Sequence, residues 1–336
     1  MKKEKILITG GCGFIGTNLI EKLRDNPAYS IRVLDNLSSG KEEDLARVHP
    51  FNKVYPHQVS SGASNKIELV EGDIRDYETC RRSCKDCDTV IHLAANTGVD
   101  LSLKNPRKDM SVNIAGTLNM LEAARENGTD KFIHASSGAA VGEVEPPLHE
   151  KILPRPISPY GVSKLSGEYY CAIYAHTFNL KTASLRFGNV YGPGSHRKSS
   201  VIARFITRAL NSETLEIYGD GSQTRDYIYV EDLVSAILNV VSLEDSHSFP
   251  WGEVFHIAAS RETTVNEVLE YLLPILSDSG YNQVEYTRLS PRKGDVKRNY
   301  SDTTKAQAHL NWKPEINLSQ GLRRTVDWFI TNLNYS

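Results

Sequence analysis

The chain has 336 residues, enough for one large α/β domain or for one domain with a smaller lobe. Its formal net charge is −2 and its acidic and basic residues are interspersed, so we expect no nucleic-acid partner. No apolar run approaches the ~20 residues of a membrane span and the N-terminus lacks an apolar signal segment, so we expect a cytoplasmic protein with no membrane partner.

The first predicted elements are a strand, a glycine turn and a helix. Residues 6–9 are apolar or β-branched, and apolar residues recur at helical spacing after Phe14. Gly10 permits the turn, Gly13 lets a ligand approach bare backbone, and Gly16 lets the helix lie close to the strand. The helix N-terminus suits a pyrophosphate, because its N–H groups are unpaired and carry partial positive charge.

A second strand, predicted at residues 31–34, ends in Asp35, nineteen residues after Gly16 (35 − 16). A dinucleotide-binding fold places at this point the carboxylate that bonds the adenosine ribose hydroxyls. A carboxylate here repels a 2′-phosphate, which favours NAD over NADP. The alternative is a purely structural glycine turn, and the strand, the helix and Asp35 together argue against it.

Strands and helices alternate through the first half, which predicts a Rossmann-like, doubly wound parallel sheet. Residues 41–66 predict a short helix followed by a surface loop, and one long helix is expected over residues 108–126. Further strands are expected at 67–70, 90–93, 131–134 and 182–187, and a second long helix at 160–178. After residue 193 the pattern loosens into shorter elements, which predicts a smaller mixed α/β lobe.

The five cysteines imply no disulfide framework. Cys80, Cys84 and Cys87 lie close together, but three thiols without a nearby fourth ligand make a poor closed zinc site. We therefore expect reduced thiols on a helix and the turn after it, and no metal.

Tyr160 and Lys164 are four residues apart on a predicted helix, so their side chains share a face. An ammonium beside a phenol is expected to lower the tyrosine pKa from ~10 toward neutrality, giving a general base. Ser136 and Ser137 end a predicted strand at the sheet edge where ligands bind, and a hydroxyl there can bond the same substrate oxygen. The alternatives are an ordinary surface Tyr–Lys pair and serines that only cap the strand.

These motifs resemble those of the extended short-chain dehydrogenases/reductases, and most closely the UDP-galactose 4-epimerase group of nucleotide-sugar enzymes. The resemblance runs nearly end to end, and it is specific because of the order and spacing of short motifs. The matching segments are residues 9–16, 35–40, 72–74, 92–95, 113, 136–137, 160–164, 186–193, 219–227 and 292–295.

The resemblance implies an NAD-dependent 4-epimerase that interconverts UDP-hexoses, UDP-N-acetylhexosamines or both through a 4-keto intermediate. It implies that the catalytic residues are Ser137, Tyr160 and Lys164. It implies that NAD is bound by Gly10, Gly13, Phe14, Ile15, Gly16, Asp35, Asn36, Ser38, Ser39, Gly40, Asp73, Ile74, Leu93, Ala94, Ala95, Asn113, Tyr160 and Lys164. The implied substrate-binding residues are Ser137, Asn189, Tyr218, Arg225, Arg292, Asp295 and Asn299.

Within these sets the resemblance assigns residues to different parts of the ligands. Asp73 and Ile74 flank the adenine, whereas residues 94–95 and Asn113 line the nicotinamide half. For Arg225 and Arg292 general chemistry supports the implied role in substrate binding, because guanidinium groups form bidentate hydrogen bonds with a diphosphate. A solvated charged turn is the alternative for the other basic residues of this run, Lys293, Lys297 and Arg298.

Two departures from the family pattern bear on the reaction. Val141 stands where the family often has a tyrosine, which predicts a packing change only. Gly138 and Ala139 stand where related dehydratases carry an Asp-Glu pair, so elimination of water has no obvious agent. Dehydration, decarboxylation or epimerisation at another carbon is the alternative outcome, and a catalytically silent dinucleotide-binding subunit is a second alternative.

Asn299 aligns with the residue that gates the C2 substituent of the sugar in the epimerases. In the family a tyrosine there excludes N-acetyl groups and a small residue admits them. Asparagine is intermediate in volume and its amide can bond an acetamido group, so we expect both substrate classes to fit. A surface asparagine is the alternative.

Both long predicted helices carry apolar residues on more than one face: Met110, Ile114, Leu118 and Leu121, then Leu165, Tyr169, Ile173 and Tyr174. A helix that is apolar on more than one face usually buries its second face against another surface. The resemblance implies that this surface is a second subunit, in a homodimer to which each subunit contributes two helices. Residues 1–180 are expected to form mainly the NAD-binding domain, with a segment near 225–260 returning to it, and residues 181–336 mainly the nucleotide-sugar lobe.

Overall fold

The computed structural model of the chain describes residues 3–59, 67–243, 249–291 and 296–333. It divides into two compact units. The first comprises Met1–Val144, Glu150–Arg186 and Ile237–Phe255, and the second comprises Glu145–His149, Phe187–Ala236 and His256–Ser336. The segment that returns to the first unit therefore begins at residue 237.

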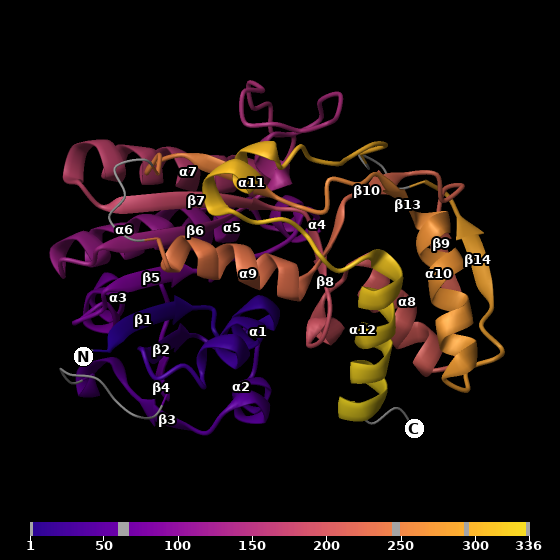
Figure 1. Cartoon of the computed structure of the whole chain (residues 1–336), viewed down its shortest axis with the longest axis horizontal. Coiled ribbons are helices and arrows are strands. Elements are labelled where there is room, and N and C mark those ends of the chain that lie inside the picture. Colours follow the sequence, from indigo (N-terminus) through magenta and orange to yellow (C-terminus); the bar gives the residue numbers. More distant parts are fainter. Residues whose placement is uncertain (1–2, 60–66, 244–248, 292–295, 334–336) are drawn as a thin grey trace. The chain divides into compact units, whose positions relative to one another are not determined.

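An eight-stranded sheet dominates the first unit, with the order β12-β7-β6-β5-β1-β2-β4-β3 (Figure 1). The strands are β1 (Glu4–Thr9), β2 (Tyr29–Asp35), β3 (Phe51–Val54), β4 (Ile67–Glu71), β5 (Thr89–His92), β6 (Lys131–Ser137), β7 (Lys181–Phe187) and β12 (Val254–Ile257). β1 pairs in parallel with β2 on one side and with β5 on the other. The strand order thus reverses beside β1, where a doubly wound sheet binds its ligand, and the predicted fold class is confirmed.

The helices of the first unit follow the predicted alternation. They are α1 (Phe14–Leu23), α2 (Glu42–Val48), α3 (Tyr77–Ser83), α4 (Val99–Lys104), α5 (Pro106–Met110), α6 (Gly116–Glu126) and α7 (Pro159–Phe178), with 3-10 turns η1 (Pro56–Gln58) and η3 (Gly138–Ala140). Asn105 begins α5 by accepting a hydrogen bond from the N–H of Lys108 (3.0 Å).

Two details of the predicted elements were wrong. β3 lies within the stretch expected to be a loop; it is a four-residue strand paired with β4, and two of its residues are exposed, so no apolar run announced it. The single helix expected over residues 108–126 is broken by a π-helical segment, η2 (Ser111–Ala115), between α5 and α6. Tertiary hydrogen bonds from Asn113, described below, accompany this break.

The core of the first unit includes Leu7, Leu34 and Phe132 from the sheet and Met120 from α6. Cys80, Cys84 and Cys87 are free thiols buried in the same cluster, as predicted for reduced thiols. Burial raises the pKa of Cys80 to about 12 and that of Cys87 to about 11, so these side chains pack as small apolar groups.

The second unit contains three short strand pairs: β8 (Asn189–Tyr191) with β11 (Tyr227–Tyr229), β10 (Thr224–Arg225) with β13 (Thr263–Thr264), and β9 (Leu215–Tyr218) with β14 (Tyr286–Leu289). Its helical elements are η4 (Ser195–Arg197), α8 (Val201–Leu210), α10 (Val265–Asp278), α11 (Thr304–Leu310) and α12 (Leu318–Asn332), and α9 (Val230–Val241) runs on into the first unit. Phe205, Leu272 and Phe329 lie in its core. Within the described ranges, none of the helices is long and apolar enough to cross a membrane.

Candidate active site

The glycine turn after β1 is closely packed against its neighbours. A Cβ on Gly10, which has φ +69°, would lie 2.9 Å from the Cα of Ala94, so the turn touches the end of β5. A Cβ on Gly16 would lie 2.5 Å from the Cα of Gly11, so this glycine closes the helix onto the turn rather than onto the strand. A Cβ on Gly13 would meet only the carbonyl oxygen of Gly10, at 3.1 Å.

No side chain in the described part of the chain caps the N-terminus of α1, which begins directly after this turn. Phe14 and Ile15 form its first turn and Gly16 follows. The end of the helix that carries partial positive charge is therefore left to an anionic ligand.

Asp35 ties the end of β2 to the glycine turn. Its Oδ2 accepts a hydrogen bond from the N–H of Cys12 (2.9 Å), and its Oδ1 accepts one from the N–H of Leu37 (2.8 Å). Burial raises the pKa of Asp35, and these two hydrogen bonds together with Lys41 oppose the shift. A Cβ on Gly40 would lie 2.1 Å from the carbonyl oxygen of Cys12, so the loop after Asp35 rests on the glycine turn.

The residues predicted to bind the adenine end lie on neighbouring loops. The Nδ2 of Asn36 donates to the Oδ2 of Asp73 (2.9 Å), and Ser38 and Ser39 on the same loop are exposed. Arg75 bonds Asp73 at 2.7 Å and holds the pKa of that carboxyl at about 2. Ile74, next in the chain, is buried.

A chain of hydrogen bonds joins the predicted nicotinamide side of the site. The N–H of Ala94 donates to Thr9 Oγ1 (3.1 Å), and Thr117 Oγ1 donates to the carbonyl of Asn113 (2.7 Å). His92 bridges the two hydroxyls, with Nδ1 at 2.8 Å from Thr9 and Nε2 at 3.0 Å from Thr117. Because the Thr117 hydroxyl already donates its proton to the Asn113 carbonyl, His92 Nε2 must carry the ring proton and donate to Thr117. His92 Nδ1 must then accept a hydrogen bond from the Thr9 hydroxyl. Burial lowers the pKa of His92 to about 3, so the ring stays neutral.

Asn113 clamps the loop that follows β5. Its Oδ1 accepts from the N–H of Asn96 (2.7 Å), and its Nδ2 lies within hydrogen-bond distance of the Asn96 carbonyl (3.0 Å), Asp109 Oδ1 (3.0 Å) and Ser163 Oγ (3.2 Å). The side chain is 2% exposed. It therefore holds the backbone of Asn96, the residue that follows Ala95, and the π-helical segment carries it.

The turn after Ser137 packs directly against the helix that carries Tyr160. Ser137 begins η3 by accepting a hydrogen bond from the N–H of Ala139 (3.2 Å). A Cβ on Gly161 would lie 2.4 Å from the carbonyl oxygen of Ala139, so only glycine permits this approach. The structure thereby brings together Ser137 and Tyr160, as the sequence predicted for one site.

The pKa shift of Tyr160 differs from the prediction. Lys164 is 3% exposed, its Nζ donates to the carbonyl of Ala135 (2.8 Å), and it lies 5.8 Å from the Tyr160 ring centroid. Burial lowers the pKa of Lys164 to about 8 and raises that of Tyr160 to about 12, although a hydrogen bond with Ser137 favours the phenolate. The expected shift of Tyr160 toward neutrality is wrong for this structure, because burial disfavours both charged forms.

Glu168 is a site residue that the sequence analysis missed. It lies four residues after Lys164 on α7 and is 2% exposed. Arg186 donates to both of its carboxylate oxygens (2.8 and 2.7 Å), and Ser136 Oγ donates to Oε1. Its charge also raises the pKa of Lys164. The spacing of Tyr160, Lys164 and Glu168 on one helix face is the signal that could have found it.

The substrate-binding residues predicted in the second unit gather around residues 223–226. The N–H of Asn189 donates to the carbonyl of Asp226 (2.7 Å), and the N–H of Asn299 lies 3.3 Å from Thr224 Oγ1. Tyr218 ends β9, and its carbonyl accepts from Gln223 (2.9 Å). Arg292 and Asp295 lie outside the described residues.

The basic residues of the same unit are largely engaged. Arg225 donates to the carbonyls of Thr224 (2.6 Å) and Val296 (2.7 Å). Arg298 pairs with Glu262 (2.8 Å) and Glu145 (2.6 Å), and these partners raise its pKa. Lys297 is exposed, whereas Lys293 lies outside the described residues.

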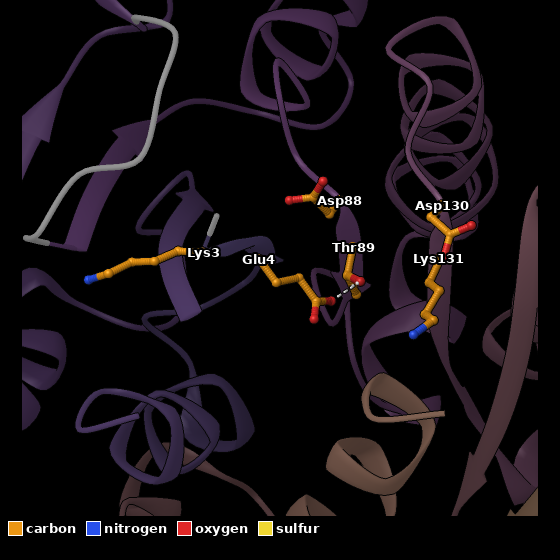
Figure 2. Close-up of a pocket in the computed structure, with 6 residues that line it drawn as sticks. All are labelled: Lys3, Glu4, Asp88, Thr89, Asp130 and Lys131. Atoms are coloured by element: carbon orange, nitrogen blue, oxygen red, sulfur yellow. Dashed lines mark hydrogen bonds between the residues drawn. The ribbon is translucent and has the colours of Figure 1, made fainter. Parts of the chain in front are cut away.

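A pocket of about 320 Å³ lies at the amino ends of β1, β5 and β6, at the end of the sheet opposite to the candidate site (Figure 2). It is lined by Lys3, Glu4, Asp88, Thr89, Asp130 and Lys131. Glu4 accepts a hydrogen bond from Thr89 (2.7 Å), and Asp130 pairs with Lys181 (2.7 Å). It is separate from the glycine turn and Ser137, which follow the carboxyl ends of β1 and β6.

Comparison with known proteins agrees with this geometry. Residues 6–258 match the model of the NAD dependent epimerase/dehydratase family. A UDP-glucose 4-epimerase of Mycolicibacterium smegmatis is 32% identical, over 97% of this chain and 98% of its own length. The structure of a UDP-glucose 4-epimerase of Thermotoga maritima with UDP-glucose is 38% identical and superposes with a TM-score of 0.85, over 98% of this chain and 100% of its own. A UDP-N-acetylglucosamine 4-epimerase of Methanobrevibacter ruminantium, in complex with UDP-N-acetylmuramic acid, is 31% identical with a TM-score of 0.85, over 99% and 100%.

Proposed function

The chain belongs to the NAD dependent epimerase/dehydratase family, and on that premise we propose that it is an NAD-dependent UDP-sugar 4-epimerase. It interconverts UDP-hexoses, UDP-N-acetylhexosamines or both through a 4-keto intermediate. The observation that carries the proposal is the packing of the Ser137 turn on α7 at Gly161, beside Tyr160 and Lys164, in a chain whose relatives include UDP-sugar 4-epimerases. We place the enzyme in the cytoplasm.

The residues at the glycine turn fit NAD. The uncapped start of α1 suits the pyrophosphate, and Asp35, held by two backbone N–H groups, would accept from ribose hydroxyls. Asp73 and Asn36 would contact the adenine end, and Lys164 the nicotinamide ribose. Bound NAD supplies a hydride acceptor and donor and, in its oxidised form, a positive charge of the sign that lowers the pKa of a phenol.

Tyr160 takes the proton of the C4 hydroxyl and later returns it to the C4 oxygen of the inverted sugar. Ser137 bonds the same oxygen and holds it in place through both steps. The amino group of Lys164 lies 5.8 Å from the Tyr160 ring centroid, and a positive charge near a phenol favours the phenolate. Positioned proton transfer of this kind contributes roughly 10²–10⁴-fold.

The reaction ends in epimerisation because the turn after Ser137 has no acid or base. Gly138 and Ala139 form η3 and carry no ionisable group, whereas loss of water across C5 and C6 needs a proton acceptor and a proton donor. The intact Ser137, Tyr160 and Lys164 argue equally against a silent dinucleotide-binding subunit.

The second unit carries the residues proposed to bind the substrate nucleotide, Asn189, Tyr218, Arg225, Arg292 and Asp295. Asn299 is proposed as the gate at C2. Its backbone is anchored at Thr224 and its side chain is half-buried, so a larger side chain there would occupy space beside the anchored strand.

A homodimer is proposed from an exposed apolar face on the first unit. Leu101 of α4, Met110 of α5, and Tyr169 and Ile173 of α7 are 51–58% exposed, and both α4 and α5 pack against α7. These side chains lie on helices that pack against one another, and burying them would remove apolar area from water. Leu121 and Tyr174, also counted in the sequence pattern, face the core instead.

The reaction is tested with a panel of UDP-glucose, UDP-galactose, their N-acetylated counterparts and UDP-glucuronate, with products resolved by NMR. We expect one or more pairs of C4 epimers to interconvert without net consumption of NAD. Accumulation of a 4-keto-6-deoxy sugar from UDP-glucose would contradict the epimerase assignment.

Replacing Tyr160 by Phe removes the proton acceptor while keeping the ring. We expect turnover to fall by roughly 10²–10⁴-fold, with NAD content and thermal stability unchanged. Tyr55→Phe, at a tyrosine that is 52% exposed, is the matched control and should retain activity. A Tyr160→Phe enzyme with near-normal turnover excludes Tyr160 as the base.

Replacing Asn299 by Tyr is expected to close the pocket to the acetamido group. Turnover of the N-acetylhexosamine pair should be lost, while UDP-glucose and UDP-galactose should still interconvert. Asn282→Tyr, at an exposed position of the same unit, controls for added surface bulk. Equal effects on both substrate classes, or none on either, would show that Asn299 is not the gate.

Light scattering is expected to give a mass near twice that of the 37.5 kDa chain at micromolar concentration. The double substitution of Tyr169 and Ile173 by Glu should yield monomers, because it places charge in the apolar face. Tyr286→Glu, at a tyrosine that is 52% exposed on β14, should leave the mass unchanged. A wild-type protein that stays monomeric contradicts the proposal.

A further inference from the structure

Asp109 is a buried carboxyl group that neither the sequence analysis nor the proposed mechanism uses. It lies on α5 and is 1% exposed. Its Oδ1 accepts a hydrogen bond from Asn113 Nδ2 (3.0 Å), whereas its Oδ2 is buried and has no hydrogen-bond partner in the described part of the chain. A buried carboxylate oxygen without a partner is costly, so it calls for a compensating interaction.

Contacts lead from Asp109 to the backbone of the catalytic tyrosine. Asn113 Nδ2 also lies 3.2 Å from Ser163 Oγ, and Ser163 Oγ donates to the carbonyl of Tyr160 (2.9 Å). Ser163 and Asn113 are both buried, at 1% and 2% exposure. The carboxyl group therefore belongs to a closed polar cluster that joins α5 and the π-helical turn to the first turn of α7.

No ion pair of Asp109 occurs among the residues that the structure describes, but charges act on it from a distance. Burial raises its pKa, and the side chains of Ser163, Asn96 and Asn113 together with the Lys164 ammonium oppose that shift. In return, the carboxylate raises the pKa of Lys164 and that of Tyr160. The titratable groups that interact electrostatically with Tyr160 or Lys164 are Asp109, Glu168, Cys171, His92 and His134.

The hydrogen bond to Asn113 does not by itself require a carboxylate. An asparagine at position 109 would offer the same acceptor to Nδ2, and an uncharged amide costs less to bury than a carboxylate. What distinguishes aspartate here is its negative charge, which acts on Tyr160 and Lys164, two groups whose charged forms are disfavoured by burial.

We propose that Asp109 is a positioning residue of the catalytic site, whose carboxylate fixes Asn113 and Ser163 against the first turn of α7 and brings a buried negative charge to bear on Tyr160 and Lys164. The proposal rests on the proposed function in one respect, the identity of Tyr160 and Lys164 as the catalytic pair. Glu168 also raises the pKa of Lys164 but is ion-paired with Arg186. Asp109 is therefore the carboxylate without an ion-paired partner among the described carboxylates that act on Lys164.

The test compares three variants of the NAD-bound enzyme: Asp109→Asn, which keeps the shape and removes the charge, Asp109→Glu, which keeps the charge and alters the shape, and Glu21→Gln, which neutralises an exposed carboxylate on α1. The dependence of kcat/KM on pH is measured for each with an interconverted UDP-sugar. Removal of the negative charge lowers the pKa of both Tyr160 and Lys164, so Asp109→Asn should move both limbs of the profile to lower pH by about one unit. In Asp109→Glu and Glu21→Gln both limbs of the pH profile should stay at their wild-type positions.

A second measurement does not need turnover. Tyrosinate absorbance is titrated in each variant and in the same variant with Tyr160→Phe, because the chain has 16 tyrosines and the difference isolates one. The Tyr160 transition should move to lower pH in Asp109→Asn and stay in place in Asp109→Glu and Glu21→Gln. If no UDP-sugar is turned over, the proposed function fails, and this titration still decides the role of Asp109.

Reduced kcat in Asp109→Asn with both limbs and the tyrosinate transition unmoved would overturn the proposal, because the residue would then act through shape alone. Circular dichroism checks folding. Should Asp109→Asn unfold, Asp109→Ser carries the same measurements. If both neutral variants unfold while Asp109→Glu folds, the residue serves the fold and the proposal is wrong.

Discussion

The buried ion pair between Glu168 and Arg186 is the interaction on which the candidate site depends most. It joins α7 to the end of β7, and through Ser136 it also holds the end of β6, directly before Ser137. Both side chains are at most 4% exposed, so loss of one partner would leave an uncompensated buried charge, typically at a cost of about 3–5 kcal/mol. The fold thereby fixes the strand that carries Ser137 and the helix that carries Tyr160 and Lys164 with one interaction.

The remainder of the cofactor edge is held by polar groups that bind backbone. Asp35 accepts one hydrogen bond from an N–H of the glycine turn and one from an N–H of its own loop. Asn113 bonds both the N–H and the carbonyl of Asn96, and His92 links two threonine hydroxyls. Each is nearly inaccessible to solvent. A residue of this kind contributes by holding a loop in place before a ligand arrives, which lowers the entropy cost of binding.

Burial sets the electrostatics of the pair more strongly than proximity does. Tyr160 and Lys164 are neighbours on α7, yet burial raises the pKa of one and lowers that of the other, and the ammonium bonds a carbonyl rather than the phenol. A site in which neither group is easily charged responds strongly to any further charge, because the interior screens poorly. This is why the buried carboxylates of Asp109 and Glu168 matter in a site where neither was expected.

The sequence by itself determined whatever depends on local spacing. The strand, glycine turn and helix around Gly10, the carboxylate of Asp35 at the end of the second strand, and the shared helix face of Tyr160 and Lys164 all follow from residues that are close in the chain or arranged by one repeating geometry. Only the tertiary structure decided the pairing of Glu168 with Arg186, the π-helical turn that presents Asn113, the four-residue strand β3, and the pKa shifts of Tyr160 and Lys164. The reason is physical: a pKa depends on burial, an edge strand on its neighbour, and a buried ion pair on segments that meet only when the chain has folded.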